Sequence, residues 1–186
     1  MIKEIIQIGD KRLLKESVKV ERADIDSKET RSLIKDLLDT CKANFEDAAG
    51  LSAVQIGVLK RVFVVKRTDL EDEYRDQWEV MINPNIKILD KKESLIWEGC
   101  LSINTGENRL YGPVYRPKKV RIEYYDQKGN KRSLDADGFF SHLIQHELDH
   151  LNGILFLSHV ENPANIWKED EFDKYLKENR QYPPIV

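Results

Sequence analysis

The chain has 186 residues, of which 40% are hydrophobic and 34% are charged, with a formal net charge of −3 at pH 7. This length is enough to bury a core in one domain with an appended element, and the weakly acidic balance gives no basis for a sequence-specific nucleic-acid binder. No apolar run approaches 18 residues and the N-terminus lacks a signal-peptide segment, so we expect a cytoplasmic protein without membrane contact.

The N-terminal part of the chain predicts a short strand at 5–8 and then an amphipathic helix. Asp26 and Glu29 fit a capping pair, and apolar residues recur beyond them at helical spacing. We therefore expect a helix over 27 to about 46, with its apolar stripe on a sheet. Cys41 lies on that stripe, which favours a buried core residue over a reactive thiol.

A run of small residues, 48–57, follows this helix and contains two glycines and the polar Gln55. Glycine allows the backbone to approach another backbone or a ligand closely, and Gln55 must find hydrogen-bond partners there. Taken alone, the segment is better explained as a tight turn with Gln55 satisfied locally. Residues 61–65 then predict a buried strand.

The middle of the chain predicts paired strands. Residues 80–89 indicate strand, turn and strand, and the charged residues 90–93 indicate a solvated hairpin tip. Cys100 follows a glycine in a strand-like context, and residues 104–113 indicate a loop or lid. Residues 119–134 predict a further hairpin.

Residues 137–152 predict a helix that carries an HExxH pattern, His146-Glu147-Leu148-Asp149-His150. Its apolar residues recur at helical intervals, between a capping aspartate and a terminating glycine. Two imidazoles four residues apart rise from one helix face, about 6 Å apart along the axis, and can meet on one metal ion. Glu147 is then close enough to handle a proton. The alternative, a solvated helix face, is weakened by the apolar residues around it.

A catalytic site of this kind usually needs a third protein ligand. Phe156 stands where the metzincin pattern needs a histidine, so that pattern is excluded. His142 lies on the same helix as the pair, but three histidines over two turns stretch across about 12 Å, so we assign it to supporting contacts. His159 is assigned to the surface or a cap.

Two candidates for the third ligand remain open. Glu169 or Glu171, on a predicted amphipathic terminal helix, would give a thermolysin-like site. Cys100 would give a Cys/His/His set, which suits zinc or ferrous iron.

Three separated segments resemble the peptide deformylase family. They are the glycine-containing segment ending in Gln55, the stretch EGCLS at 98–102 and the stretch QHELDH at 145–150. Their order and spacing match as well, so the resemblance covers most of the chain up to about 157. The first segment departs from the family pattern, with Ala48 in place of glycine and Ser52 in place of alanine.

The resemblance implies that Cys100, His146 and His150 hold one divalent ion per chain. Fe(II) is the native ion usual in the family, and Zn(II), Ni(II) or Co(II) are alternatives in purified protein. Glu147 is then the general base, accepting a proton and returning it to the departing amine.

The resemblance also implies roles in substrate recognition. The Gln55 amide and the Leu101 backbone N–H would stabilise the developing oxyanion. Gly50 would hydrogen-bond the peptide backbone, Arg116 would lie near the substrate entrance, and Ile144 would help to line a pocket for methionine. The substrates implied are N-formylmethionyl nascent peptides, and contact with the ribosome through the C-terminal helix is a further implication.

We therefore expect an α+β fold, with antiparallel strands packed around a central helix carrying HExxH, an N-terminal amphipathic helix and a C-terminal helix. Residues 1–160 would form a single catalytic domain and residues 161–186 a C-terminal helix and tail. The function implied is a metal-dependent hydrolase that removes the N-formyl group from N-terminal methionine and releases formate. The alternatives are a different HExxH metallopeptidase, or a deformylase-like protein that binds peptide or ribosome with little turnover because of Ala48 and Ser52.

Overall fold

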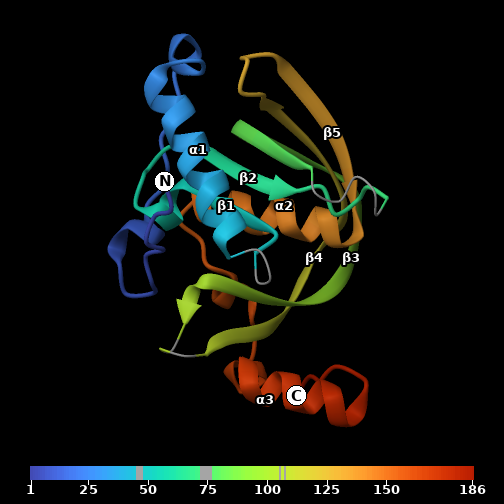
Figure 1. Cartoon of the computed structure of the whole chain (residues 1–186). Coiled ribbons are helices and arrows are strands. Elements are labelled where there is room, and N and C mark those ends of the chain that lie inside the picture. The colour runs from blue at the N-terminus through green and yellow to red at the C-terminus, as the bar shows by residue number, and fades with distance from the viewer. Residues whose placement is uncertain (45–47, 72–76, 105, 107) are drawn as a thin grey trace.

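A computed structural model describes residues 1–44, 48–71, 77–104, 106 and 108–186. Within them, a six-stranded antiparallel sheet and three α-helices form an α+β fold, as predicted (Figure 1). The strands are β1 (Gly50–Ser52), β2 (Val62–Lys66), β3 (Trp78–Asn104), β4 (Arg109–Tyr125), β5 (Lys131–Asp137) and β6 (Trp167–Lys168), and the helices are α1 (Lys28–Ala43), α2 (Gly138–Leu151) and α3 (Glu169–Asn179). No described helix is long and apolar enough to cross a membrane.

The sheet runs in the order β1-β2-β3-β4-β5, and β6 pairs with β4. The two long strands β3 and β4 pair along almost their whole length, from Ile82 opposite Tyr125 to Asn104 opposite Arg109. The predicted hairpin tip at 90–93 is therefore wrong. These charged residues lie inside β3, where two register shifts let the strand bend while its side chains stay in solvent.

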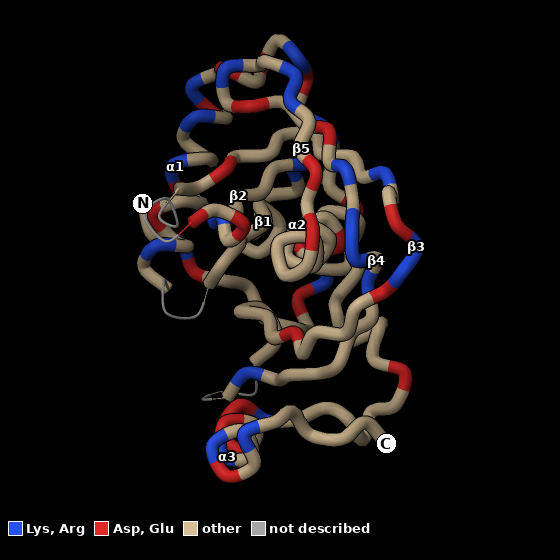
Figure 2. The backbone as a smooth tube through the Cα atoms, turned by 90° about the vertical axis from the view of Figure 1, so that its right-hand side faces the viewer, with Lys and Arg blue, Asp and Glu red and all other residues tan. Residues whose placement is uncertain are grey.

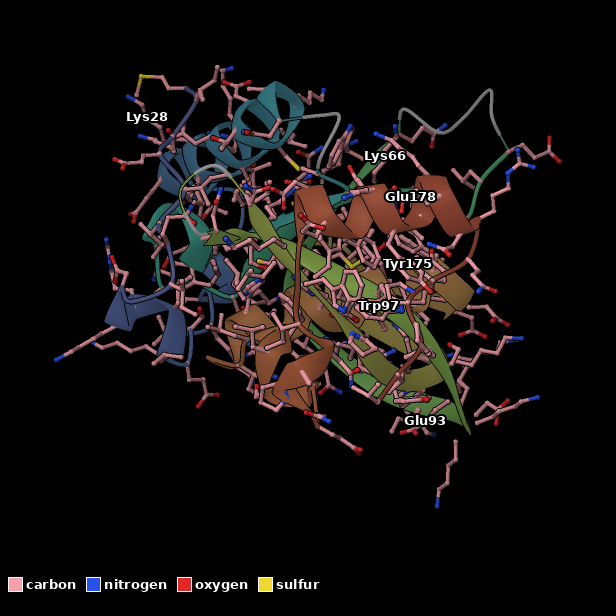
Figure 3. All side chains as sticks on the ribbon, turned by 90° about the horizontal axis from the view of Figure 1, so that it is seen from below. Lys28, Lys66, Glu93, Trp97, Tyr175 and Glu178 are labelled. Atoms are coloured by element: carbon pink, nitrogen blue, oxygen red, sulfur yellow. The ribbon has the colours of Figure 1, made fainter. Side chains whose placement is uncertain are left out.

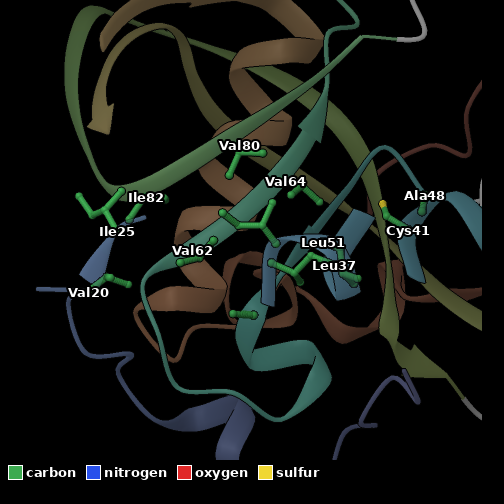
Figure 4. Close-up of a cluster of buried hydrophobic side chains, with 12 residues drawn as sticks. Val20, Ile25, Leu37, Cys41, Ala48, Leu51, Val62, Val64, Val80 and Ile82 are labelled. Atoms are coloured by element: carbon green, nitrogen blue, oxygen red, sulfur yellow. The ribbon is translucent and has the colours of Figure 1, made fainter. Parts of the chain in front are cut away.

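Helix α1 covers β1 and β2 with the apolar stripe seen in the sequence. Ile34, Leu37 and Cys41 are buried in a core cluster with valines of β2 (Figure 4). The N-cap is Ser27, whose hydroxyl accepts a hydrogen bond from the Thr30 N–H at 3.1 Å. The helix ends at Ala43, and residues 45 and 46, which the prediction included, lie outside the described residues.

Helix α2 packs its apolar face against the inner face of the sheet. Phe140, Ile144 and Leu151 belong to one buried cluster with side chains of β2, β3 and β4. The helix is seen nearly end-on in Figure 2, enclosed by other elements. Gly153 lies just beyond its end at φ +73°, where a β-carbon would stand 2.7 Å from the backbone of Leu14. The close approach of these two segments therefore requires glycine.

The N-terminal residues do not form the predicted strand. The Ile6 N–H donates to the Gln55 carbonyl at 2.9 Å, and the Ile8 N–H donates to the Ser102 carbonyl at 2.8 Å. Each of these two segments accepts only one hydrogen bond from the N-terminal residues. No β-ladder therefore forms. This segment instead joins the turn around Gln55 to the end of β3.

The C-terminal helix α3 is attached to β3 and β4 by aromatic rings. Phe172 is buried, with its ring centroid 5.0 Å from that of Trp97 and 4.9 Å from that of Tyr111. Trp97 is seen beneath α3 in Figure 3. Residues C-terminal to 160 are therefore part of the packed structure.

Candidate active site

A pocket of about 210 Å³ opens between four parts of the fold. Its walls come from residues 48–50 with Gln55, from residues 96–101 of β3, from Arg109 and Tyr111 of β4, and from α2. The short strand β1, the end of β3 and the inner helix thus meet at one point.

Three candidate metal ligands converge in this part of the fold. Cys100 Sγ and one ring nitrogen from each of His146 and His150 lie within 4.8 Å of one another. The two histidines stand on successive turns of α2, with ring centroids 4.9 Å apart. Cys100 comes from β3, and its Sγ lies 3.2 Å from His150 Nε2. Among the described residues this is the only such group, and it contains neither Glu169 nor Glu171.

Glu98 holds the first of these histidines in place. Its Oε2 lies 2.9 Å from His146 Nδ1, which leaves Nε2 of that ring for a metal. Its Oε1 lies 3.4 Å from His142 Nδ1, and Ser94 Oγ lies 3.0 Å from the other nitrogen of His142. His142 therefore supports Glu98, in line with its predicted role. Burial opposes ionisation of Glu98, but hydrogen bonds from His142, His146 and Arg116 lower its pKa well below the usual value.

Arg116 completes this buried network. It is 4% exposed, and it donates to Glu98 through Nε at 2.6 Å and Nη2 at 3.0 Å. Its Nη1 donates to Asp149 Oδ2 at 2.6 Å, and His159 Nε2 lies 2.9 Å from the same oxygen. Arg116 was predicted near the substrate entrance, but it is not among the pocket-lining residues. Its guanidinium instead binds the carboxylates of Glu98 and Asp149.

Ile144 is likewise absent from the pocket lining. It is fully buried in the core cluster between α2 and the sheet, since its position on α2 faces away from the histidine pair. Phe139 and Leu143 from the same helix line the pocket, together with Ile96 and Trp97 from β3. Helical spacing alone did not distinguish the two apolar faces of a helix that is buried on most sides.

Glu147 and its neighbours form the opposite side of the pocket. Glu147 is 3% exposed, and burial raises the pKa of its carboxyl to about 7, against the lowering effects of His146 and of a hydrogen bond from Ser52. Gly50 lies directly against it, because a β-carbon there would stand 2.6 Å from Glu147 Oε1. A side chain at Gly50 would therefore displace the carboxylate.

Gln55 is satisfied on both sides of its amide. Its Oε1 accepts from the Ser52 N–H at 2.8 Å, and its Nε2 donates to Ser102 Oγ at 3.2 Å and lies 3.6 Å from Cys100 Sγ. Leu101, adjacent to Cys100, also lines the pocket. The structure thus places Gln55, Leu101, Gly50 and Glu147 around one pocket.

The donor set fits a divalent ion. One thiol and two imidazoles suit zinc or ferrous iron, and three protein ligands leave a position open. Against the effect of burial, the adjacent Cys100 and Glu98 raise the pKa of His146 well above its usual value. His150 Nδ1 is buried without a hydrogen-bond partner among the described residues, and burial, together with the charges of His146 and Arg116, lowers the pKa of His150 well below its usual value.

Comparisons with known proteins agree with this geometry. A family model described as "Polypeptide deformylase" matches residues 2–165. The chain belongs to the peptide deformylase family. A peptide deformylase of Brachyspira hyodysenteriae is 35% identical over 181 residues, covering 97% of this chain and 90% of the relative.

Solved peptide deformylase structures also match this chain. The Ehrlichia chaffeensis deformylase in complex with actinonin has a TM-score of 0.75 at 31% identity, covering 97% of this chain and 99% of the other. A class I type b deformylase of Acinetobacter baumannii, bound to Met-Ala-Ser, has a TM-score of 0.75 at 28% identity, covering 86% and 99%. The chain is accordingly a metal-dependent deformylase that removes the formyl group from N-formylmethionyl peptides.

Sequence reasoning missed the buried contacts that support this site. Glu98 was recognised as part of a motif but given no role, although an acid two residues before Cys100 on a strand must face the same side as that cysteine. Ser52 was treated only as a departure from the family pattern. No sequence signal indicated that its hydroxyl contacts Glu147.

Proposed function

We propose that deformylation by this chain uses one ion held by Cys100, His146 and His150, with Glu147 as the general base. The observation that carries the proposal is the convergence of one sulfur and two ring nitrogens within 4.8 Å, beside a buried carboxylate in the same pocket. Helix α2, which carries the HExxH pattern, is then the central element around which the site is built. When bound, the ion lowers the pKa of water and polarises the formyl carbonyl.

The residues of the chain then have separate tasks. Glu147 holds the proton taken from water and returns it to the departing amine nitrogen. Gln55 Nε2 and the Leu101 N–H stabilise the oxyanion that develops on the formyl oxygen. The buried Arg116 acts on the site through Glu98 and His146.

The pocket supports recognition of formylmethionine. Strand β1 is the end of the sheet order, so the backbone of Gly50 can pair with an extended peptide added as a further strand. Ile96, Phe139 and Leu143 offer an apolar wall for the methionine side chain. Ile144 supports this wall from behind, within the core.

Fe(II) is the proposed native ion, with Zn(II), Ni(II) or Co(II) as substitutes. A cytoplasmic location is proposed from the substrates, since N-formylmethionyl chains are newly made polypeptides. We further propose that residues 1–160 are the catalytic domain and 161–186 the C-terminal helix and tail, a division that the family match over 2–165 supports.

Contact of α3 with the ribosome is also a proposal. The helix Glu169–Asn179 carries five acidic and two basic residues, so electrostatics favour a basic protein surface over RNA. The charged positions of α3 are coloured in Figure 2. Its anchoring through Phe172 places it close to the pocket rather than extended from the body.

The test combines metal content with turnover. Protein purified without oxygen is analysed for metal, and formate release from formyl-Met-Ala-Ser is measured. Cys100→Ser should lose the metal and the activity, whereas Cys41→Ser, the same change at a buried cysteine outside the site, should keep both. Glu147→Gln should keep the metal and lose about 10²–10⁴-fold in kcat. Full metal content in Cys100→Ser would contradict the proposed ligand set, and a metal-loaded but inactive wild type would favour the binding-only alternative.

A further inference from the structure

The hydroxyl of Ser52 contacts the carboxylate proposed as the general base. Ser52 Oγ lies 2.7 Å from Glu147 Oε2 and 2.9 Å from the backbone carbonyl oxygen of the same residue. Both side chains are buried, with Ser52 fully enclosed. Within the described part of the chain, this is the hydrogen bond that the Glu147 carboxylate receives.

The two oxygens of this carboxylate have different surroundings. Oε2 is held by Ser52, while Oε1 faces the α-carbon of Gly50, where a β-carbon would come within 2.6 Å. Gly50 and Glu147 both line the pocket. One oxygen is thus held by Ser52, and the other faces Gly50 on the wall of the pocket.

The backbone of Ser52 fixes a second group of the site. Its N–H donates to Gln55 Oε1 at 2.8 Å, so the amide must turn its Nε2 toward Cys100 and Ser102. Ser52 therefore contacts both a proton-handling group and an oxyanion donor from one position on β1. The backbone contact is available to any residue, but the hydroxyl contact requires serine or threonine.

We propose that Ser52 is a positioning residue that holds Glu147 Oε2 and so directs Oε1 to the reacting water and the leaving amine. The inference rests on the proposed function of Glu147. One alternative raised by the sequence is that Ser52, which replaces the alanine of the family pattern, reduces turnover. On this proposal its hydroxyl supports turnover. Serine is suited to the role because a buried carboxylate without a hydrogen bond is costly and is free to rotate.

The test compares Ser52→Ala with Ser52→Thr in the metal-loaded full-length protein. Removing the hydroxyl should lower kcat about 10-fold and change KM less than about twofold, because orientation is lost while the pocket surface is unchanged. Threonine keeps the hydroxyl and should restore kcat to within about threefold of wild type. Crystal structures of both proteins should be determined with and without metal. Glu147 should have one orientation in the wild type and several orientations in Ser52→Ala.

The matched control is Ser141→Ala on α2. Ser141 is also fully buried, and its hydroxyl donates to a backbone carbonyl, that of Pro117, at 3.1 Å. It should lower thermal stability about as much as Ser52→Ala and leave kcat unchanged. Equal kcat in wild type and Ser52→Ala, or an unmoved Glu147 carboxylate, would overturn the proposal. If the wild type releases no formate, but Glu147 is ordered in the wild type and disordered in Ser52→Ala, the proposed function is rejected and the positioning role of Ser52 is kept.

Discussion

Arg116 provides a direct test of how the buried charges support the site. Its side chain is 5% exposed, and those of its partners Glu98 and Asp149 are 6% and 17% exposed. Arg116→Met keeps an unbranched apolar side chain but removes the guanidinium that pairs with both carboxylates. Breaking a buried ion pair in this way destabilises a protein by about 3–5 kcal/mol. For a domain of this size, about 2–4 °C per kcal/mol gives a fall in Tm of about 6–20 °C.

The loss of stability in Arg116→Met should depend on pH. The pKa of Glu98 is lowered from its usual 4.5, so its stabilising effect is complete at neutral pH and is lost only as the pH falls below about 4.5. In Arg116→Met the carboxyl can relieve its unpaired charge by binding a proton. The difference in unfolding free energy between wild type and variant should therefore be largest near pH 7 and shrink in acid.

Thermal and urea unfolding, each with and without a chelator, separate this effect from stabilisation by bound metal. Because Glu98 also orients His146, metal affinity should fall about 10–100-fold. The control is Arg121→Met, which removes an equally well-formed pair with Asp135 at 2.6 and 2.8 Å on the surface. That change should cost less than about 1 kcal/mol. An unchanged Tm in Arg116→Met, with KM raised more than about 10-fold, would refute this reasoning and place Arg116 in contact with substrate.

Three further predictions concern the pocket, α3 and the core. Gly50→Ala should lower kcat about 10²-fold, measured by formate release, because the new β-carbon displaces Glu147 Oε1. Phe172→Ala should loosen α3, seen as faster tryptic cleavage there and a higher KM, and unchanged cleavage would show that α3 is held by other contacts. Cys41 is buried, which raises the pKa of its thiol, so it should react with a thiol reagent only after unfolding. The reaction of Cys41 alone can be followed with a chromogenic disulfide in Cys100→Ser.

Local patterns in the sequence were sufficient for the helices. The predicted helix at 137–152 is α2, Gly138–Leu151, and the stripe containing Cys41 is buried as expected. The sequence spacing of His146 and His150 also determines their relative position, because residues four apart on an α-helix share a face. These features depend on neighbours within one or two turns.

The long-range contacts were decided by the tertiary structure. Periodicity did not show that residues 78–104 continue as one strand, because charges at 90–93 are compatible with both a turn and an exposed bend. Resemblance to a family, not spacing, selected Cys100 over the glutamates of the terminal helix. The partners of Arg116, and the hydroxyl of Ser52 against a residue 95 positions away, arise only when β1, β3, β4 and α2 pack together. A sequence specifies which groups are available, but a buried hydrogen bond depends on the backbone that surrounds both of its partners.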